Sequence, residues 1–128
     1  METLIYLDTH VTVWLYGGKL GLFHPDTLAE IRNGTLLISP VVALELQYLF
    51  ETDRISVKSD TVVRELSESI GLRFCTRDFG KVIERSIAMD WTRDPFDRLI
   101  TAQAAIFNSP LLTKDKTIRQ HYRYAFWD

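Results

Sequence analysis

The stretch LIYLDTHVTVWLY, residues 4–16, decides the fold of this chain of 128 residues. It begins with four apolar residues in a row, which is typical of a short strand buried on both faces. Asp8 and Thr9 end this run, and a helical stretch follows up to Tyr16, where Gly17-Gly18 stops it. A buried strand that leads directly into a helix indicates an α/β protein.

The rest of the chain repeats this alternation. Short apolar runs predict further strands at 36–38, 72–75, 111–113 and 125–127. Helices are predicted at about 24–33, 39–51, 59–70, 78–89 and 94–107, with Ser39 and Pro40 as a helix cap and first helical residue. We therefore expect a single domain over residues 1–128, a three-layer α/β/α fold with a central, mostly parallel sheet of four to five strands.

Composition is ordinary for a soluble globular protein, with 46% hydrophobic and 25% charged residues. No apolar run approaches the roughly 18–20 residues of a membrane helix, so we expect no membrane association. The N-terminus lacks the features of a signal peptide, and Cys75 is the single cysteine, which together predict a reducing, cytoplasmic setting. The net charge of −2 argues mildly against a protein that only holds nucleic acid, although residues 114–123 are locally basic.

Four acidic residues are predicted to meet at one edge of this sheet. Asp8 directly follows the first strand, and Asp115 lies two residues beyond the apolar part of the fourth. Asp97 falls in the first turn of a helix, and Glu45 lies early in the helix that follows the second strand. Because ligands of parallel sheets bind beyond the carboxyl ends of the strands, this edge is the expected site.

Glu45 is the most informative of the four acids. Helical spacing places it on one face with Val41, Tyr48 and Leu49, and no Lys or Arg stands three or four residues away. An ionised carboxylate on an apolar face costs several kcal/mol unless it is paired or bound to metal. A hard cation, Mg²⁺ or Mn²⁺, shared with the other three acids would compensate it and would support hydrolysis of a phosphodiester by an activated water.

Each acid also has a purely structural interpretation. Asp8 could cap the helix after the first strand, and Asp115 could be an ordinary turn residue. Asp94, before Pro95, has the position of a helix cap, and Asp97 three residues later would complete a reciprocal capping box. The coincidence of four acids at one end of the sheet favours the metal site over these separate explanations.

Several neighbours are expected to support the site. The hydroxyls of Thr9 and Thr113 could orient a carboxylate, water or phosphate, or could only cap. Flanking phosphates of a nucleic acid would meet the basic side chains Arg98, Lys114 and Lys116.

The remaining reactive or aromatic side chains are assigned structural places. The three histidines show no spacing typical of metal ligands, and His10 is expected on a helix surface. Trp14 is expected in the core or at an interface. Cys75 is expected to be a buried packing residue.

Four segments, in order, resemble PIN-domain nucleases of the VapC toxin group. They are residues 7–10, 38–46, 94–104 and 111–115, which contain LDTH, ISPVVALEL, DPFDRLITAQA and LLTKD. The resemblance covers essentially the whole chain, and the third segment is its most specific part. It implies metal-binding roles for Asp8, Glu45, Asp97 and Asp115, with Asp94 in support.

The resemblance also implies an activity and partners. Members of this group are ribonucleases that cut structured RNA, often tRNA or ribosomal RNA. An antitoxin encoded alongside usually keeps them inactive, and they tend to form dimers. This chain is therefore expected to be a Mg²⁺-dependent endoribonuclease, the toxin of a toxin–antitoxin pair.

Other classes fit less well. A phosphotransferase of the haloacid dehalogenase type would need a second Asp where His10 stands, and a receiver domain would need a phosphoacceptor near Phe74 and Cys75. A catalytically silent PIN-like module that only binds a protein or RNA partner is the remaining alternative. Dependence of RNA cleavage on divalent metal separates that module from the nuclease.

Overall fold

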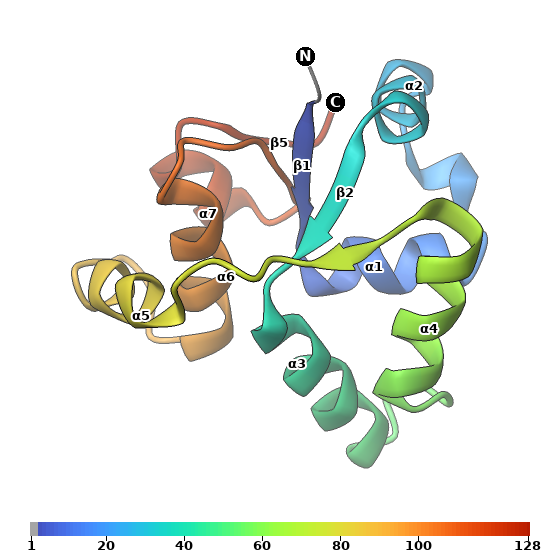
Figure 1. The fold of residues 1–128 in the computed structure, drawn as a ribbon, viewed down its shortest axis with the longest axis horizontal. Helices are drawn as coiled ribbons and strands as arrows, with labels where there is room; N and C mark the ends of the chain where they lie inside the picture. Colours follow the sequence, from blue (N-terminus) through green and yellow to red (C-terminus); the bar gives the residue numbers. More distant parts are fainter. Residues whose placement is uncertain (1–2) are drawn as a thin grey trace.

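The computed structural model describes residues 3–128, and its five strands form one parallel sheet in the order β3-β2-β1-β4-β5. The parallel α/β architecture predicted from the sequence is therefore confirmed (Figure 1). The strands are β1 (Leu4–Leu7), β2 (Thr35–Ile38), β3 (Arg73–Phe74), β4 (Leu111–Leu112) and β5 (Ala125–Phe126). The last three are shorter than predicted, whereas β1 has the predicted bounds and β2 begins one residue earlier.

Strand β1 lies in the middle of the sheet and is the most deeply buried. It pairs with β2 on one side, where Ile5 lies opposite Leu36, and with β4 on the other, where Leu7 lies opposite Leu112. Ile5 and Leu7 are 2% and 0% exposed. A strand with neighbours on both edges and helices on both faces has no solvent side, which explains its uninterrupted apolar run.

Helices flank the sheet on both sides. In Figure 1, α1, α2 and α4 lie to one side of β1 and β2, and α5, α6 and α7 lie to the other. Their bounds are α1 (Thr9–Tyr16), α2 (Pro25–Asn33), α3 (Pro40–Glu51), α4 (Ser59–Ile70), α5 (Phe79–Ile87), α6 (Pro95–Ala105) and α7 (Lys116–His121), with a 3₁₀ turn, η1, at Leu20–Leu22.

Two of these elements, α7 and η1, were not predicted. The α7 sequence, KTIRQH, is polar apart from one residue, so it has no apolar period from which a helix could be recognised. That one residue, Ile118, is 1% exposed and fixes the helix on the core. In η1, no residue is buried, so hydrophobic patterning could not reveal it either.

The helix boundaries arise from local chemistry that the sequence predicted correctly. The Ser39 hydroxyl accepts a hydrogen bond from Val41 N at 3.2 Å, and Pro40 is the first residue of α3. Gly71 ends α4 with a left-handed φ of 71°, which glycine adopts without steric cost. Since α1, α3 and α7 each begin directly after a strand, their N-termini gather at the carboxyl edge of the sheet.

Cys75 is a free cysteine and is buried, as predicted. Its sulfur accepts hydrogen bonds from the Tyr6 hydroxyl and from Gln103 Nε2, both at 3.1 Å. Burial raises the pKa of Tyr6. No helix in the described part of the chain has the length and apolar character needed to cross a membrane.

A candidate acidic active site

The predicted acids come together in one pocket of about 360 Å³ at the carboxyl edge of the sheet. Asp8 reaches it from the end of β1, and Asp115 from the segment after β4. Glu45 reaches it from α3, and Asp97 from the first turn of α6. We call this cavity the acid pocket; its lining residues are Asp8, His10, Trp14, Glu45, Asp94, Asp97, Lys114 and Asp115.

Asp8 is both a helix cap and a wall of the acid pocket. Its Oδ1 accepts a hydrogen bond from Val11 N at 2.9 Å, and its Oδ2 accepts one from the Thr113 hydroxyl. The residue is 8% exposed, and burial raises the pKa of its carboxyl group against the opposing effect of these hydrogen bonds. The capping interpretation is confirmed for Asp8, and it coexists with a place in the pocket.

Glu45 is held by a threonine from the neighbouring helix. The hydroxyl of Thr9, at the start of α1, donates a hydrogen bond to Glu45 Oε1. Burial raises the pKa of the Glu45 carboxyl group, and the nearby charges of Asp94 and Asp8 add to this rise. Within residues 3–128 no Lys or Arg forms an ion pair with Glu45.

Asp94 and Asp97, at the start of α6, differ in that only Asp94 caps the helix. Asp94 caps the helix, since its Oδ1 accepts from Phe96 N at 2.8 Å and from Asp97 N at 3.2 Å. The reciprocal half of the predicted capping box does not form, because Asp94 N donates to Thr92 Oγ1 instead. The Asp97 carboxylate is therefore not used by the cap.

Asp97 also carries a strongly perturbed carboxyl group. Burial, and then the charges of the neighbouring acids, raise its pKa to about 7. In the described chain, no hydrogen bond or ion pair reaches its carboxylate oxygens. The acids that repel it are, in decreasing order of effect, Asp94, Asp115, Glu45 and Asp8.

Thr113 connects two of the acids. Besides its bond to Asp8, its hydroxyl oxygen accepts a hydrogen bond from Asp115 N at 3.1 Å. Asp115 in turn caps α7, with Oδ1 accepting from Ile118 N at 2.9 Å. Thr113 is fully buried, so it holds both acids against the core.

Of the three basic residues predicted to contact phosphate, only one lines the acid pocket. Lys114 lines the acid pocket. Arg98 instead donates from Nε to Thr92 O at 2.8 Å, which ties α6 to the preceding loop. Lys116 is exposed at the first position of α7, outside the lining of the pocket.

Sequence reasoning missed two residues of the acid pocket, His10 and Trp14. His10 was expected on a helix surface, and it is exposed, but that surface faces the acids. Trp14 lies one helical turn later, and the ring centroids of the two residues are 6.3 Å apart. His10 and Trp14 stand four residues apart and therefore share one face of α1, but the sequence alone does not show that this face is turned toward the acids.

The chemistry of the acid pocket suits a hard divalent cation. All of its acidic donors are carboxylates, the ligand type that Mg²⁺ and Mn²⁺ prefer. Burial is the main cause of the raised pKa values of Asp8, Glu45 and Asp97, and no Lys or Arg in residues 3–128 forms an ion pair with them. In residues 3–128, however, no three His, Cys, Asp or Glu side chains form a ready-made ligand group, so a cation would require side-chain adjustment.

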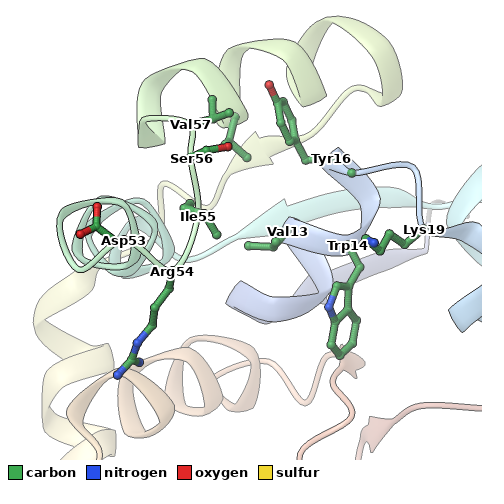
Figure 2. Close-up of a pocket in the computed structure, with 11 residues that line it drawn as sticks. Val13, Trp14, Tyr16, Lys19, Asp53, Arg54, Ile55, Ser56 and Val57 are labelled. Atoms are coloured by element: carbon green, nitrogen blue, oxygen red, sulfur yellow. The ribbon is translucent and has the colours of Figure 1, made fainter.

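A second cavity, of about 530 Å³, adjoins the acid pocket and has a different lining. It lies between α1 and the segment 53–57 that precedes α4, and we call it the apolar groove (Figure 2). Val13, Ile55 and Val57 contribute its apolar surface, and the cationic Lys19 also lines it. Trp14 lines both cavities.

Comparison with known proteins gives a family match and several similar proteins. The family model of the PIN domain matches residues 5–124. The chain is 28% identical over 123 residues to Ribonuclease VapC22 of Mycobacterium tuberculosis, covering 93% of this chain and 92% of that protein. Its fold resembles VapBC2 of Rickettsia felis bound to a promoter DNA fragment, with a TM-score of 0.68, 19% identity and coverage of 98% and 100%.

A toxin–antitoxin complex from Klebsiella pneumoniae shows the same fold, with a TM-score of 0.63, 15% identity and 95% coverage of each chain. These structural likenesses concern the fold. The family match spans nearly all of the sequence and includes every acid of the pocket. This chain therefore belongs to the PIN domain family, as its four sequence segments predicted.

Proposed function

We propose that this protein is a metal-dependent endoribonuclease that hydrolyses RNA phosphodiester bonds, acting as the toxin of a toxin–antitoxin pair. One observation carries the proposal: Asp8, Glu45, Asp97 and Asp115 line one pocket, and no cationic side chain in residues 3–128 forms an ion pair with them. Membership of the PIN domain family and the likeness to a VapC ribonuclease support the same function.

The four acids would hold one or two Mg²⁺ or Mn²⁺ ions. When bound, the cation would activate water and stabilise negative charge on the phosphate. Thr9 and Thr113 orient Glu45 and Asp8 by hydrogen bonds, which reduces the freedom that these ligands would lose on binding. Lys114 would contact a phosphate of the RNA at the edge of the pocket.

An antitoxin partner would need to block the acid pocket, and the apolar groove offers a place from which it could do so. The groove exposes aliphatic surface from Val13, Ile55 and Val57 beside the pocket, and Trp14 borders both. Lys19 and Arg54 also line it, so an apolar segment with acidic flanks would be complementary. We propose that the antitoxin binds here, and Val57→Asp should weaken its co-purification with the toxin.

A homodimer is also part of the proposal. Leu44 and Tyr48 lie one turn apart on α3, and they are 62% and 45% exposed. Phe74 of β3, 38% exposed, lines the same surface depression as Leu44. Such neighbouring exposed apolar side chains are typical of interfaces, and light scattering on the protein and on Leu44→Glu would measure the oligomeric state.

The direct test is cleavage of RNA with controlled metal. Purified protein should cut total RNA or tRNA with Mg²⁺ or Mn²⁺, and EDTA should stop the reaction. Added metal should also raise the melting temperature of the parent protein more than that of Asp97→Asn, because the variant lacks one carboxylate. Equal gains, or no cleavage under any metal, would favour the catalytically silent module instead. Mapping the cut ends would identify the RNA.

A further inference from the structure

Aromatic side chains form one side of the acid pocket. His10 and Trp14 line the pocket from the same face of α1, with ring centroids 6.3 Å apart and planes inclined at 48°. Behind them, Trp127 contacts Trp14 in an edge-to-face arrangement at 5.5 Å. We call these three residues the aromatic wall.

The aromatic wall is held in place from behind. Trp127 is 9% exposed and packs on Phe23, with ring centroids 5.1 Å apart. Its backbone oxygen accepts a hydrogen bond from the Thr27 hydroxyl at 3.2 Å. Trp14 is half-buried against this fixed ring, whereas His10 is exposed. A flat side chain that is fixed on one side and open to a cavity on the other loses little freedom when it binds a planar ligand.

Positive charge lies beside the wall. Lys114 lines the acid pocket, and its Nζ lies 5.8 Å from the centre of the Trp127 ring. An aromatic surface, a cationic group and a cluster of carboxylates therefore border one cavity. A nucleotide offers the matching parts: a planar base, a phosphate for the lysine, and a phosphodiester bond at the acids.

We propose that the aromatic wall stacks the unpaired base of a nucleotide adjoining the scissile phosphate, with Lys114 contacting its phosphate. This inference rests on the proposed ribonuclease function and assigns Trp14 and His10 as the side chains that receive a base beside the cut. A base held in a duplex keeps both faces stacked on its neighbours, so it cannot present one to Trp14.

Core packing alone explains the wall less well. A tryptophan that served only the core would not border two open cavities, as Trp14 does. Figure 2 shows its indole extending from α1 away from Tyr16. The position of His10 is not explained by packing, since its side chain is exposed.

The experiment combines substitutions in the wall with removal of the base. An RNA hairpin that the protein cuts in its loop is made again with an abasic nucleotide on either side of the mapped cut. For the parent protein, one of these abasic positions should lower kcat/KM about tenfold, as expected for the loss of one base–aromatic stack. For Trp14→Leu the intact hairpin should already be cut about tenfold more slowly, and the abasic change should add nothing.

Two further variants separate stacking from packing. Trp14→Phe should retain most of the activity and the sensitivity to the abasic nucleotide, because it keeps an aromatic face. Phe107→Leu is the matched control, since Phe107 is 59% exposed beyond the C-terminal end of α6 and does not line the acid pocket. If Trp14→Leu slows cleavage of the intact and abasic hairpins by the same factor, Trp14 acts through packing and the proposal is wrong.

A binding measurement makes the test independent of cleavage. In the Asp97→Asn background with Mg²⁺, fluorescence anisotropy of a labelled single-stranded RNA should show Kd rising about tenfold on addition of Trp14→Leu. A matching duplex should bind more weakly and should not respond to the substitution. If the parent cleaves no RNA, the proposed function fails by itself, whereas unchanged anisotropy with an active parent overturns only the aromatic wall.

Discussion

The acid pocket and the apolar groove share Trp14 as a lining residue, yet their other lining residues differ in kind. The groove gathers apolar side chains that the core did not cover, and its charged residues, Lys19, Asp53 and Arg54, are of both signs. The acid pocket gathers five carboxylates around about 360 Å³ of space. The groove is therefore a surface that a partner could cover, whereas the pocket holds like charges that repel until something positive binds.

This difference between the two cavities shows that the acid pocket is the part of the molecule where the arrangement of side chains lowers stability. In the pocket, burial and repulsion raise the pKa values of Asp8, Glu45 and Asp97. Such arrangements destabilise the metal-free protein and are typical of functional sites. Comparing equivalent substitutions in the two cavities tests this contrast directly.

The largest effect is expected for cleavage by Asp97→Asn. The substitution keeps the size of the side chain but removes a proposed ligand, so the RNA cleavage rate should fall by more than about 100-fold. Asp53→Asn is the matched control in the apolar groove, where Asp53 has a left-handed φ of 61° that asparagine also tolerates. If Asp97→Asn cleaves RNA like the parent, or if both variants lose the same share of activity, the acid pocket does not differ from the apolar groove in its importance for cleavage.

A smaller effect is expected for stability against pH. The pKa of Asp97 is raised from 3.8 to about 7, so the folded protein holds this proton more strongly than the unfolded chain. The free energy of unfolding of the metal-free protein should therefore fall as pH rises from about 4 to 7. Asp8 and Glu45 act in the same direction.

Urea denaturation in EDTA at several pH values would measure this dependence. Asp97→Asn should flatten the curve and should be more stable than the parent above pH 7, whereas Asp53→Asn should follow the parent. A parent whose stability rises between pH 4 and 7 would show that the acids of the pocket gain favourable interactions on folding, contrary to the structure.

The smallest effect is expected for Thr9→Val. The Thr9 hydroxyl orients Glu45, and loss of such a supporting bond typically costs about tenfold in activity. Thr12→Val on the same helix is the control, because the Thr12 hydroxyl donates to the backbone oxygen of Asp8 and to no carboxylate of the pocket. Cleavage rates and melting temperatures of both variants, measured together, would distinguish orientation of Glu45 from general damage to α1.

Much of the fold followed from the sequence because its signals are local. The apolar run of β1, the Ser39-Pro40 start of α3 and the Gly71 end of α4 each need only their own neighbours to act. The 3₁₀ turn η1 and helix α7 escaped prediction for the reverse reason. Only the assembled sheet supplies the surface on which Ile118 is buried.

In the candidate site, too, some features follow from the sequence and others depend on the assembled fold. Its acids could be predicted to meet because strand ends in a parallel sheet share one edge. The bonds from Thr9 to Glu45 and from Thr113 to Asp8 join residues far apart in the sequence, so only the structure reveals them. His10 lies on the helix surface and Trp14 packs against the core, as predicted, but nothing in their own segment shows that they also face the acids.

Three of the acids, Asp8, Asp94 and Asp115, also begin helices, whereas Glu45 and Asp97 cap none. A descendant of this protein that no longer needed its chemistry would still be under pressure to keep those three, because replacing a cap costs about 1 kcal/mol. The presence of these three acids in a relative is therefore weak evidence that the relative is an active nuclease. Evolutionary decay should first become visible at Glu45 and Asp97, and these two positions are the ones to inspect when judging whether a related gene product is still active.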